Sequence, residues 1–286
     1  MKTPNRKIRW SIHVSFLTGL ILFCFTNCRI DHGLEPLFSK ITGRIIYTGD
    51  APRRTDEIRL AAAHDFPPKD INELLFSEQI PYDQDTVDYE LYLPQGEYEV
   101  IALIWKEKSR SWNISDLIGV YGGSFIGDQL IPTYQPITIP DKQTVLKGID
   151  IQANLNRVNR DATIEGEILF EGAWPEDTGA IGVGAFIEIP EQGNVIDYFF
   201  KSIDINYSIP TWVARTAYQL RVHKTDTLEY IAVLWINQDY DLGALKDIGF
   251  YRDSLDPSSP GVVIIPEGLD RIENIDIVVD FSETGK

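Results

Sequence analysis

The 286-residue chain contains only two cysteines, Cys24 and Cys28, and both lie near its N-terminus. Every residue from Arg29 onward therefore lacks a thiol. Disulfide bonds and thiolate metal sites both need cysteine side chains, so they are excluded from that part of the chain.

A second long apolar run is also missing after Cys28, where no stretch approaches the roughly 20 apolar residues of a membrane span. Before it, four basic residues precede an apolar run over 14–25, which is typical of a secretory signal peptide. Residues 25–28 resemble the lipobox of bacterial lipoproteins, with Asn27 where a smaller residue is usual. The sequence therefore predicts a lipoprotein signal peptide over 1–27 and lipidation of Cys28. An ordinary signal peptide or an uncleaved anchor is the alternative.

Basic residues are scarce, since 26 Lys and Arg face 43 Asp and Glu and the net charge is −17. Such a surface repels phosphate backbones and anionic headgroups, which excludes nucleic acid as an expected partner. It attracts divalent cations or a basic partner, although acidic charge is equally explained by solubility alone.

Motifs of common hydrolases and nucleotide-binding proteins are missing as well. The chain has no Gly-x-Ser-x-Gly, no His-Glu-x-x-His and no glycine-rich phosphate loop. Of the four histidines, His13 lies in the signal peptide, His32 in the segment after it, His64 at the end of an expected strand and His223 in an expected turn. The sequence predicts no enzymatic activity, with a hydrolase that uses an unrecognised carboxylate site as the alternative.

What the sequence does contain is an internal repeat. Residues 41–52 return without a gap as 164–175, and three further segments return in the same order. These are 101–105 as 231–235, 118–121 as 248–251, and 148–151 as 274–277. One module is therefore duplicated. The repeated residues are mainly apolar, Gly and Pro, which indicates a copied scaffold rather than a copied active site.

Within each unit the apolar residues alternate with polar ones, as in half-buried strands. In 149–155, for example, Ile149, Ile151, Ala153 and Leu155 should face inward and the residues between them outward. Gly and Pro interrupt the pattern often, and no long helix is expected. The sequence predicts an all-β fold of two tandem Ig-like (prealbumin-like) β-sandwiches. We expect a tether over 28–39, repeats over 40–155 and 162–282, a linker over 156–161 and a tail over 283–286.

A family resemblance rests on residues 89–100, which read Tyr-Glu-Leu-Tyr-Leu-Pro-Gln-Gly-Glu-Tyr-Glu-Val. An aromatic strand followed by Leu-Pro-x-Gly-x-Tyr resembles the hairpin of transthyretin-like modules, including carboxypeptidase regulatory-like domains. We expect Pro94 and Gly96 to set the turn and Tyr98 to return its hydroxyl to the turn backbone, as in a tyrosine corner. The second unit lacks these residues at 222–228, so its membership rests on the repeat. The resemblance implies a binding, spacing or adhesion role without naming a ligand.

A candidate calcium loop follows the apolar strand that ends at Trp235. Asn237, Asp239 and Asp241 place oxygen side chains at alternate positions, as calcium loops do. No Gly follows Asp241, and Ile248 occupies the position where a calcium loop carries its last glutamate. A solvated acidic loop is the alternative.

Aromatic residues outside the repeated segments are the candidate ligand-binding residues, because a binding surface can differ between copies of one scaffold. They are Trp112, Trp174, Trp212 and Tyr240. Flat aromatic rings stack on sugars or anchor protein partners. Trp105 and Trp235 occupy equivalent strand positions and are expected in the core.

These features predict a lipid-anchored bacterial envelope protein that acts as a non-catalytic binding or assembly module. Because Arg29, rather than an inner-membrane-retaining Asp, follows Cys28, the outer membrane is the expected location. A carbohydrate-binding outer-membrane lipoprotein is the main alternative. No cofactor is expected beyond a structural calcium ion, and an envelope protein or a glycan is the expected partner.

Lipidation is tested by Cys28→Ser. This change should abolish incorporation of a labelled fatty acid and release the protein from the membrane fraction, because the acylated thiol is lost. Cys24→Ser is the matched control and should keep its label. Continued acylation of the Cys28→Ser chain would defeat the prediction.

Overall fold

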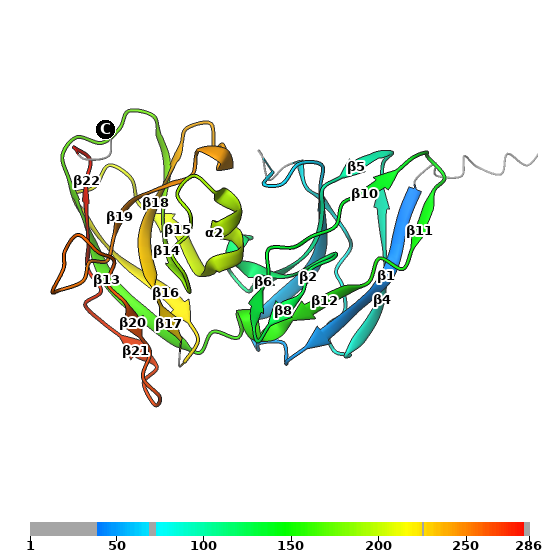
Figure 1. Cartoon of the computed structure of the whole chain (residues 1–286), viewed down its shortest axis with the longest axis horizontal. Coiled ribbons are helices and arrows are strands. Elements are labelled where there is room, and N and C mark those ends of the chain that lie inside the picture. Colours follow the sequence, from blue (N-terminus) through cyan, green and yellow to red (C-terminus); the bar gives the residue numbers. More distant parts are fainter. Residues whose placement is uncertain (1–38, 69–72, 225, 283–286) are drawn as a thin grey trace, which may run out of the picture. The chain divides into compact units, whose positions relative to one another are not determined.

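A computed structural model describes residues 39–68, 73–224 and 226–282 (Figure 1). The predicted signal peptide, Cys28, nearly all of the tether and the C-terminal tail lie outside the described residues. No helix in the described ranges is long and apolar enough to cross a membrane.

In the described residues, the first repeat forms twelve strands and the 3-10 helices η2 and η3, shown in blue to green in Figure 1. They are β1 (Ser39–Thr48), β2 (Thr55–Ala63), β3 (Leu75–Phe76), β4 (Thr86–Leu93), β5 (Gly96–Tyr98), β6 (Val100–Glu107), η2 (Ile114–Asp116), β7 (Leu117–Val120), β8 (Phe125–Ile126), β9 (Gln129–Leu130), β10 (Ile137–Ile139), β11 (Val145–Lys147), β12 (Ile151–Asn154) and η3 (Leu155–Val158).

The second repeat has the same order of main strands and adds one α-helix. Its elements are β13 (Ala162–Glu171), β14 (Thr178–Phe186), α2 (Val195–Lys201), β15 (Ser202–Ile209), β16 (Arg215–Val222), β17 (Thr227–Leu228), β18 (Tyr230–Asn237), η4 (Leu242–Ala244), β19 (Lys246–Phe250), β20 (Val263–Ile264), β21 (Arg271–Ile272) and β22 (Ile277–Asp280).

Each repeat is a sandwich of two sheets with matching topology. In the first, β1 pairs antiparallel with β4 and parallel with β11 and β12, and the facing sheet has the order β3-β2-β6-β7. In the second, β13 pairs with β16, β21 and β22, and the facing sheet has the order β15-β14-β18-β19. The predicted all-β fold is confirmed.

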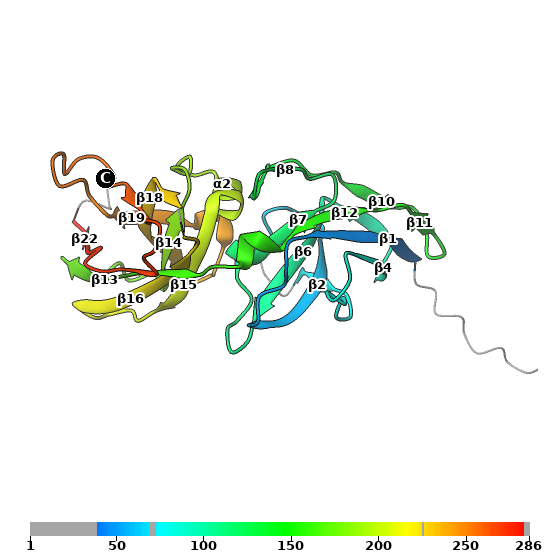
Figure 2. The same ribbon diagram turned by 90° about the horizontal axis from the view of Figure 1, so that it is seen from below.

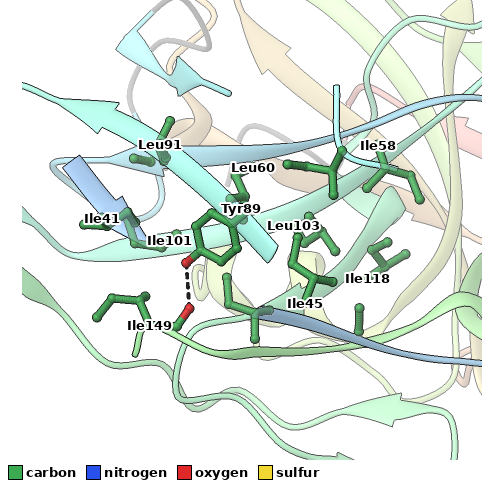
Figure 3. Packing of buried hydrophobic residues seen from close by; sticks show 14 of the residues in the cluster. Ile41, Ile45, Ile58, Leu60, Tyr89, Leu91, Ile101, Leu103, Ile118 and Ile149 are labelled. Atoms are coloured by element: carbon green, nitrogen blue, oxygen red, sulfur yellow. Dashed lines mark hydrogen bonds between the residues drawn. The ribbon is translucent and has the colours of Figure 1, made fainter. Parts of the chain in front are cut away.

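The core of the first sandwich lies between its two sheets and contains the inward residues of the alternating strands. Figure 3 shows Ile41 and Ile45 of β1 packed among side chains from β2, β4 and β6. Trp105 and Trp235 are buried in the cores of the two sandwiches, as expected from their repeated positions. Asn154 departs from the expected alternation: it is buried, and its amide Nδ2 donates to Asp128 Oδ1 at 2.8 Å.

The same hydrogen bond, from a tyrosine hydroxyl to a backbone carbonyl that lies against a glycine, occurs in both sandwiches. The hydroxyl of Tyr89 donates to the Ile149 carbonyl at 2.6 Å (Figure 3), and Tyr218 donates to the Ile275 carbonyl at 2.6 Å. Those carbonyls lie against Gly43 and Gly166, where any Cβ atom would overlap the oxygen. A side chain at either glycine would therefore displace the last strand from β1 or β13.

A second repeated feature is a chain of hydrogen bonds that anchors each core tryptophan. The indole Nε1 of Trp105 donates to Thr55 Oγ1 at 2.8 Å, and the Thr55 hydroxyl donates to the Pro52 carbonyl at 2.7 Å. Trp235 makes the same chain through Thr178 to Pro175, at 3.0 and 2.8 Å. The buried indole N–H groups are satisfied in this way, which explains why Thr, Pro and Trp recur together.

The expected tyrosine corner is present in the first repeat, because the Tyr98 hydroxyl donates to the Pro94 carbonyl at 3.0 Å. The repeats differ most beside β2 and β14. The edge of β2 pairs with only two residues of β3, whereas β14 pairs with the eight-residue β15, which follows α2.

Candidate functional site

The sheets β3-β2-β6-β7 and β15-β14-β18-β19 carry apolar residues on both of their faces. In β6, Ile101 and Leu103 face the sandwich core, whereas Val100 and Ala102 belong to a different buried cluster. In β18, Ile231, Val233 and Trp235 likewise face the second core. Tyr230, Ala232, Leu234 and Ile236 face the other way and are also buried. An apolar run without alternation is the pattern of a strand that is covered on both sides.

The outward faces of the two sheets meet in one shared hydrophobic cluster, which we call the inter-sandwich cluster. The first repeat contributes Ala63, Val100, Ala102, Leu117, Val120 and Leu130, and the second contributes residues of β14, β15, β18 and α2. Helix α2 contacts η2 and β9 of the first repeat, and the helix can be followed in Figures 1 and 2. Phe66 packs edge-on against Phe199 of α2, with ring centroids 5.2 Å apart. The two sandwiches therefore share a core.

This cluster does not fill the space between the sheets, and a cavity of about 610 Å³ remains. Four alanines line it, and their short side chains leave the space open: Ala61, Ala63, Ala102 and Ala180. Six aromatic residues also line it: Phe66, Phe76, Trp112, Phe199, Tyr207 and Tyr240. A cavity of this volume with mostly apolar walls has the dimensions of a small-molecule site.

Trp112 lines the cavity and is held in place by two neighbouring side chains. Its ring stacks on Phe76, with centroids 5.6 Å apart and an interplanar angle of 24°. The Lys106 ammonium lies 5.8 Å from the Trp112 ring centroid, a distance that permits a cation–π contact. The indole is therefore preorganised before a ligand enters.

Few polar groups reach the cavity. Asn113 is occupied, because its Oδ1 accepts from Ser115 N at 3.1 Å and its Nδ2 donates to the Ile205 carbonyl. The Tyr207 hydroxyl and the Asp239 carboxylate both lack a hydrogen-bond or ion-pair partner within the described part of the chain. Burial, together with the nearby Asp116 and Asp204 carboxylates, raises the pKa of Tyr207, so its hydroxyl stays neutral and can donate.

A buried ionic network lies behind the cavity and joins the two repeats. Asp204 of β15 is 1% exposed and contacts Arg110 at 3.1 Å and Arg160 at 3.3 Å. Glu107 of β6 is 3% exposed and pairs with Arg54, Arg110 and Arg221. Charges that are buried this deeply are tolerated because each one has an opposite partner.

Asp116 is the strained member of this network. Its Oδ1 lies 2.9 Å from Arg160 Nη1, yet neither carboxylate oxygen makes a hydrogen bond within the described residues. Burial raises the pKa of Asp116 to about 6, more than the attraction of Arg160 lowers it. Arg160 comes from the linker expected over 156–161, and Arg157 of the same segment is also buried. This linker therefore places Arg157, Val158 and Arg160 in the interior, whereas Asn159 and Asp161 are exposed.

The predicted ligand-binding aromatics separate into two groups. Trp112 and Tyr240 both line the cavity, although they come from different repeats. Trp174 and Trp212 lie elsewhere on the second sandwich, with ring centroids 5.6 Å apart and Trp174 packed on Phe170. Trp212 is 56% exposed.

The predicted calcium-binding residues form a turn after β18. Asn237 Oδ1 accepts from Asp241 N at 3.2 Å, and Asp241 Oδ1 accepts from Gly243 N at 2.9 Å, where it caps η4. Asp239 lines the cavity instead. Across the described ranges, no group of three or more His, Cys, Asp or Glu side chains is arranged to hold a metal ion. Calcium binding at this loop stays a prediction.

The histidines of the described residues make local contacts outside the cavity. His64 Nδ1 lies 2.5 Å from the Glu97 carbonyl, and the His64 ring stacks on Tyr98. His223 Nδ1 lies 3.0 Å from Asp226 Oδ2, three residues along the chain. Neither ring belongs to the cavity lining.

The sequence alone does not predict the roles of Tyr207, the lining alanines or the buried linker arginines. One sequence pattern does indicate the interface. Residues 101–105 and 231–235 are unbroken apolar runs, whereas a strand with one solvent-exposed face would alternate apolar and polar residues. For the arginines no local pattern exists, because their burial depends on the other repeat. Tyr207 is 38% exposed, and no local pattern marks it as a cavity residue.

Comparisons with known proteins give no family assignment. No protein-family model matches the chain. No curated protein matches it either. Among solved structures, it is similar to a leucine-rich repeat protein from Bacteroides thetaiotaomicron, with a TM-score of 0.34, 6% identity, and coverage of 85% of this chain and 26% of that one. The chain thus spans about a quarter of that protein.

Two further structures are similar at the same low level. A streptococcal ancillary pilin has a TM-score of 0.23 and 11% identity, covering 85% of this chain and 63% of the pilin. A tip fimbrial protein from Porphyromonas gingivalis has a TM-score of 0.23 and 9% identity, covering 74% and 81%.

The role of the ionic network is tested by Asp204→Asn. We expect this change to lower the free energy of unfolding by about 3–5 kcal/mol in urea titrations, because Arg110 and Arg160 lose their shared buried partner. Asp150→Asn is the control: that carboxylate pairs with Arg44 at 2.7 Å on the exposed surface and should matter far less. Equal effects of the two changes would contradict a buried network.

Proposed function

We propose that this protein is a lipid-anchored, non-catalytic binding module of a bacterial envelope, and that its binding site is the cavity between the two sandwiches. The observation that best supports this site is that Trp112 and Tyr240, which are far apart in the sequence, line one cavity of about 610 Å³. Apolar walls with few free polar groups suit a small, mostly apolar ligand. Such a ligand would contact both repeats at once.

Binding is favoured over catalysis by the state of the polar groups. A hydrolase needs a nucleophile or an activated water beside a positioned acid or base. Tyr207 is neutral, and burial raises its pKa, which makes it a hydrogen-bond donor rather than a base. The alternative of a hydrolase with a carboxylate site therefore gains no support from the groups that line the cavity.

Location and anchoring rest on the N-terminal residues. The basic start, the apolar run over 14–25 and the lipobox-like 25–28 support export and acylation of Cys28, and Arg29 supports the outer membrane. The contact of Tyr98 with Pro94 supports the proposal that the first repeat is a transthyretin-like module of the carboxypeptidase regulatory-like type.

Carbohydrate binding is the second candidate, and one observation favours it. Trp212 is 56% exposed and lies 5.6 Å from Trp174, so the two rings form an aromatic surface outside the cavity. Exposed indoles of this kind can stack on sugar rings. A soluble glycan that quenches the fluorescence of the parent but not of Trp212→Ala would support this function.

Ligand binding in the cavity is tested with the neutral apolar dye Nile red. We expect saturable fluorescence enhancement with the full chain in lipid nanodiscs, after subtraction of empty nanodiscs. Ala180→Phe should abolish it, because Ala180 lines the cavity and is only half-buried, so a phenyl ring can fill the space. Trp112→Ala should weaken it by about tenfold through loss of one aromatic wall.

Trp212→Ala is the matched control, because it removes an indole of the same kind outside the cavity. Its dye affinity should equal that of the parent. Thermal melts of all variants report whether they remain folded. Unchanged dye binding in a folded Ala180→Phe protein would rule out the cavity as the site.

Calcium at Asn237, Asp239 and Asp241 remains a separate proposal, supported by the alternating oxygen side chains. Bound calcium would raise the melting temperature by mass action. We expect a higher melting temperature in millimolar calcium than in chelator, and no such difference in Asp241→Asn. Identical melts of the parent in both buffers would remove the proposal.

A further inference from the structure

The chemistry of the ligand can be read from the charged groups that reach the cavity, if the cavity is the binding site proposed above. Asp239 is the one charged side chain among the described residues that line it. This carboxylate is exposed and has no hydrogen-bond or ion-pair partner in the described part of the chain. The cavity therefore presents a free negative charge at one point of a mostly apolar wall.

The nearby cations are already neutralised. The Lys106 ammonium, which lies over Trp112, pairs with Asp56 at 2.6 Å and with Glu57 at 3.5 Å. Arg110 and Arg160 behind the cavity pair with Asp204. A carboxylate or phosphate on the ligand would meet no free cation here and would be repelled by Asp239.

A cationic group meets the opposite situation. Tyr240 lines the same cavity as Asp239, and an aromatic ring attracts an ammonium group by about 0.5–2 kcal/mol. Tyr240 is held with its hydroxyl 3.4 Å from the Gly179 carbonyl. The net charge of −17 adds a general attraction for cations.

The rest of the cavity selects the remainder of the ligand. Phe66 and Phe199 pack against each other, and alanines line the sheets on both sides. These walls offer no hydrogen bonds from their side chains, and Tyr207 supplies a single free hydroxyl, so a sugar or another polyhydroxylated compound would lose most of its hydration without replacement. An alkyl or aromatic body fits without that loss.

We propose that the ligand is a small amphiphile with an apolar body and a single ammonium group, whose body occupies the cavity against residues that include Trp112 and whose ammonium lies against Asp239 and Tyr240. This inference rests on the proposed binding function and names its ligand class. The ligand bridges the repeats, because Trp112 belongs to the first and Asp239 and Tyr240 belong to the second.

The test uses three probes that share a decyl chain and differ in the head group: decyltrimethylammonium, decanol and decanoate. Each is titrated calorimetrically, below its micelle-forming concentration, into the full chain in zwitterionic nanodiscs, with empty nanodiscs subtracted. We expect the ammonium probe to bind about tenfold more tightly than decanol, and decanoate to bind most weakly.

Asp239→Asn should weaken binding of the ammonium probe about fivefold and leave decanol unchanged, because the exposed carboxylate contributes a modest ion pair. Asp50→Asn is the matched control, since Asp50 is exposed in the turn after β1 and does not line the cavity. Its affinity for all three probes should equal that of the parent.

The outcomes separate this inference from the proposed function. If decanoate binds as tightly as the ammonium probe, or Asp239→Asn leaves ammonium binding unchanged, while Ala180→Phe still abolishes binding, then the cavity binds ligands and the ammonium inference is wrong. If no probe binds, or binding survives in Ala180→Phe, the proposed function fails together with the inference.

Discussion

The contact between two sheets that bury both of their faces is the constraint on which the other features depend. A sandwich normally buries one face of each sheet and exposes the other to water. Here Val100 and Ala102 of β6 and Ala232 and Leu234 of β18 belong to a buried cluster outside both sandwich cores. Separating the repeats would expose this apolar surface, so the two sandwiches are stable as a pair.

The two copies of the module differ at this contact, because only the second repeat carries additional elements there. The second repeat carries α2 and β15 beside β14, where the first has the two residues of β3. Phe199 and Phe200 of α2 fill part of the contact, and Asp204 of β15 organises the buried arginines. Where alanines line the contact instead, the space stays unfilled and forms the cavity. The unequal part of the repeat therefore builds both the interface and the candidate site.

Part of the candidate site could be identified from the sequence, because Trp112 and Tyr240 lie outside the repeated segments and were chosen for that reason. The same criterion also selected Trp174 and Trp212, which pack together on a different surface. No sequence pattern distinguishes the two pairs, since the distinction depends on which loop ends at the interface. Tyr207 could not be predicted as a cavity residue, because it lies within a strand, where aromatic residues are common for reasons of packing.

The sequence by itself determined the scaffold. The period of two, the repeated Gly43 and Gly166, and the linked Thr, Pro and Trp residues specify two sandwiches through local geometry and neighbouring strands. These interactions form inside one repeat, so they appear in the sequence as a repeated pattern. Only the tertiary structure decided that the sheets meet through their outer faces, that Arg157 and Arg160 are buried, and that a cavity lies between the repeats. Those features require residues about a hundred positions apart to meet in space. The sequence pattern of either segment alone does not predict that contact.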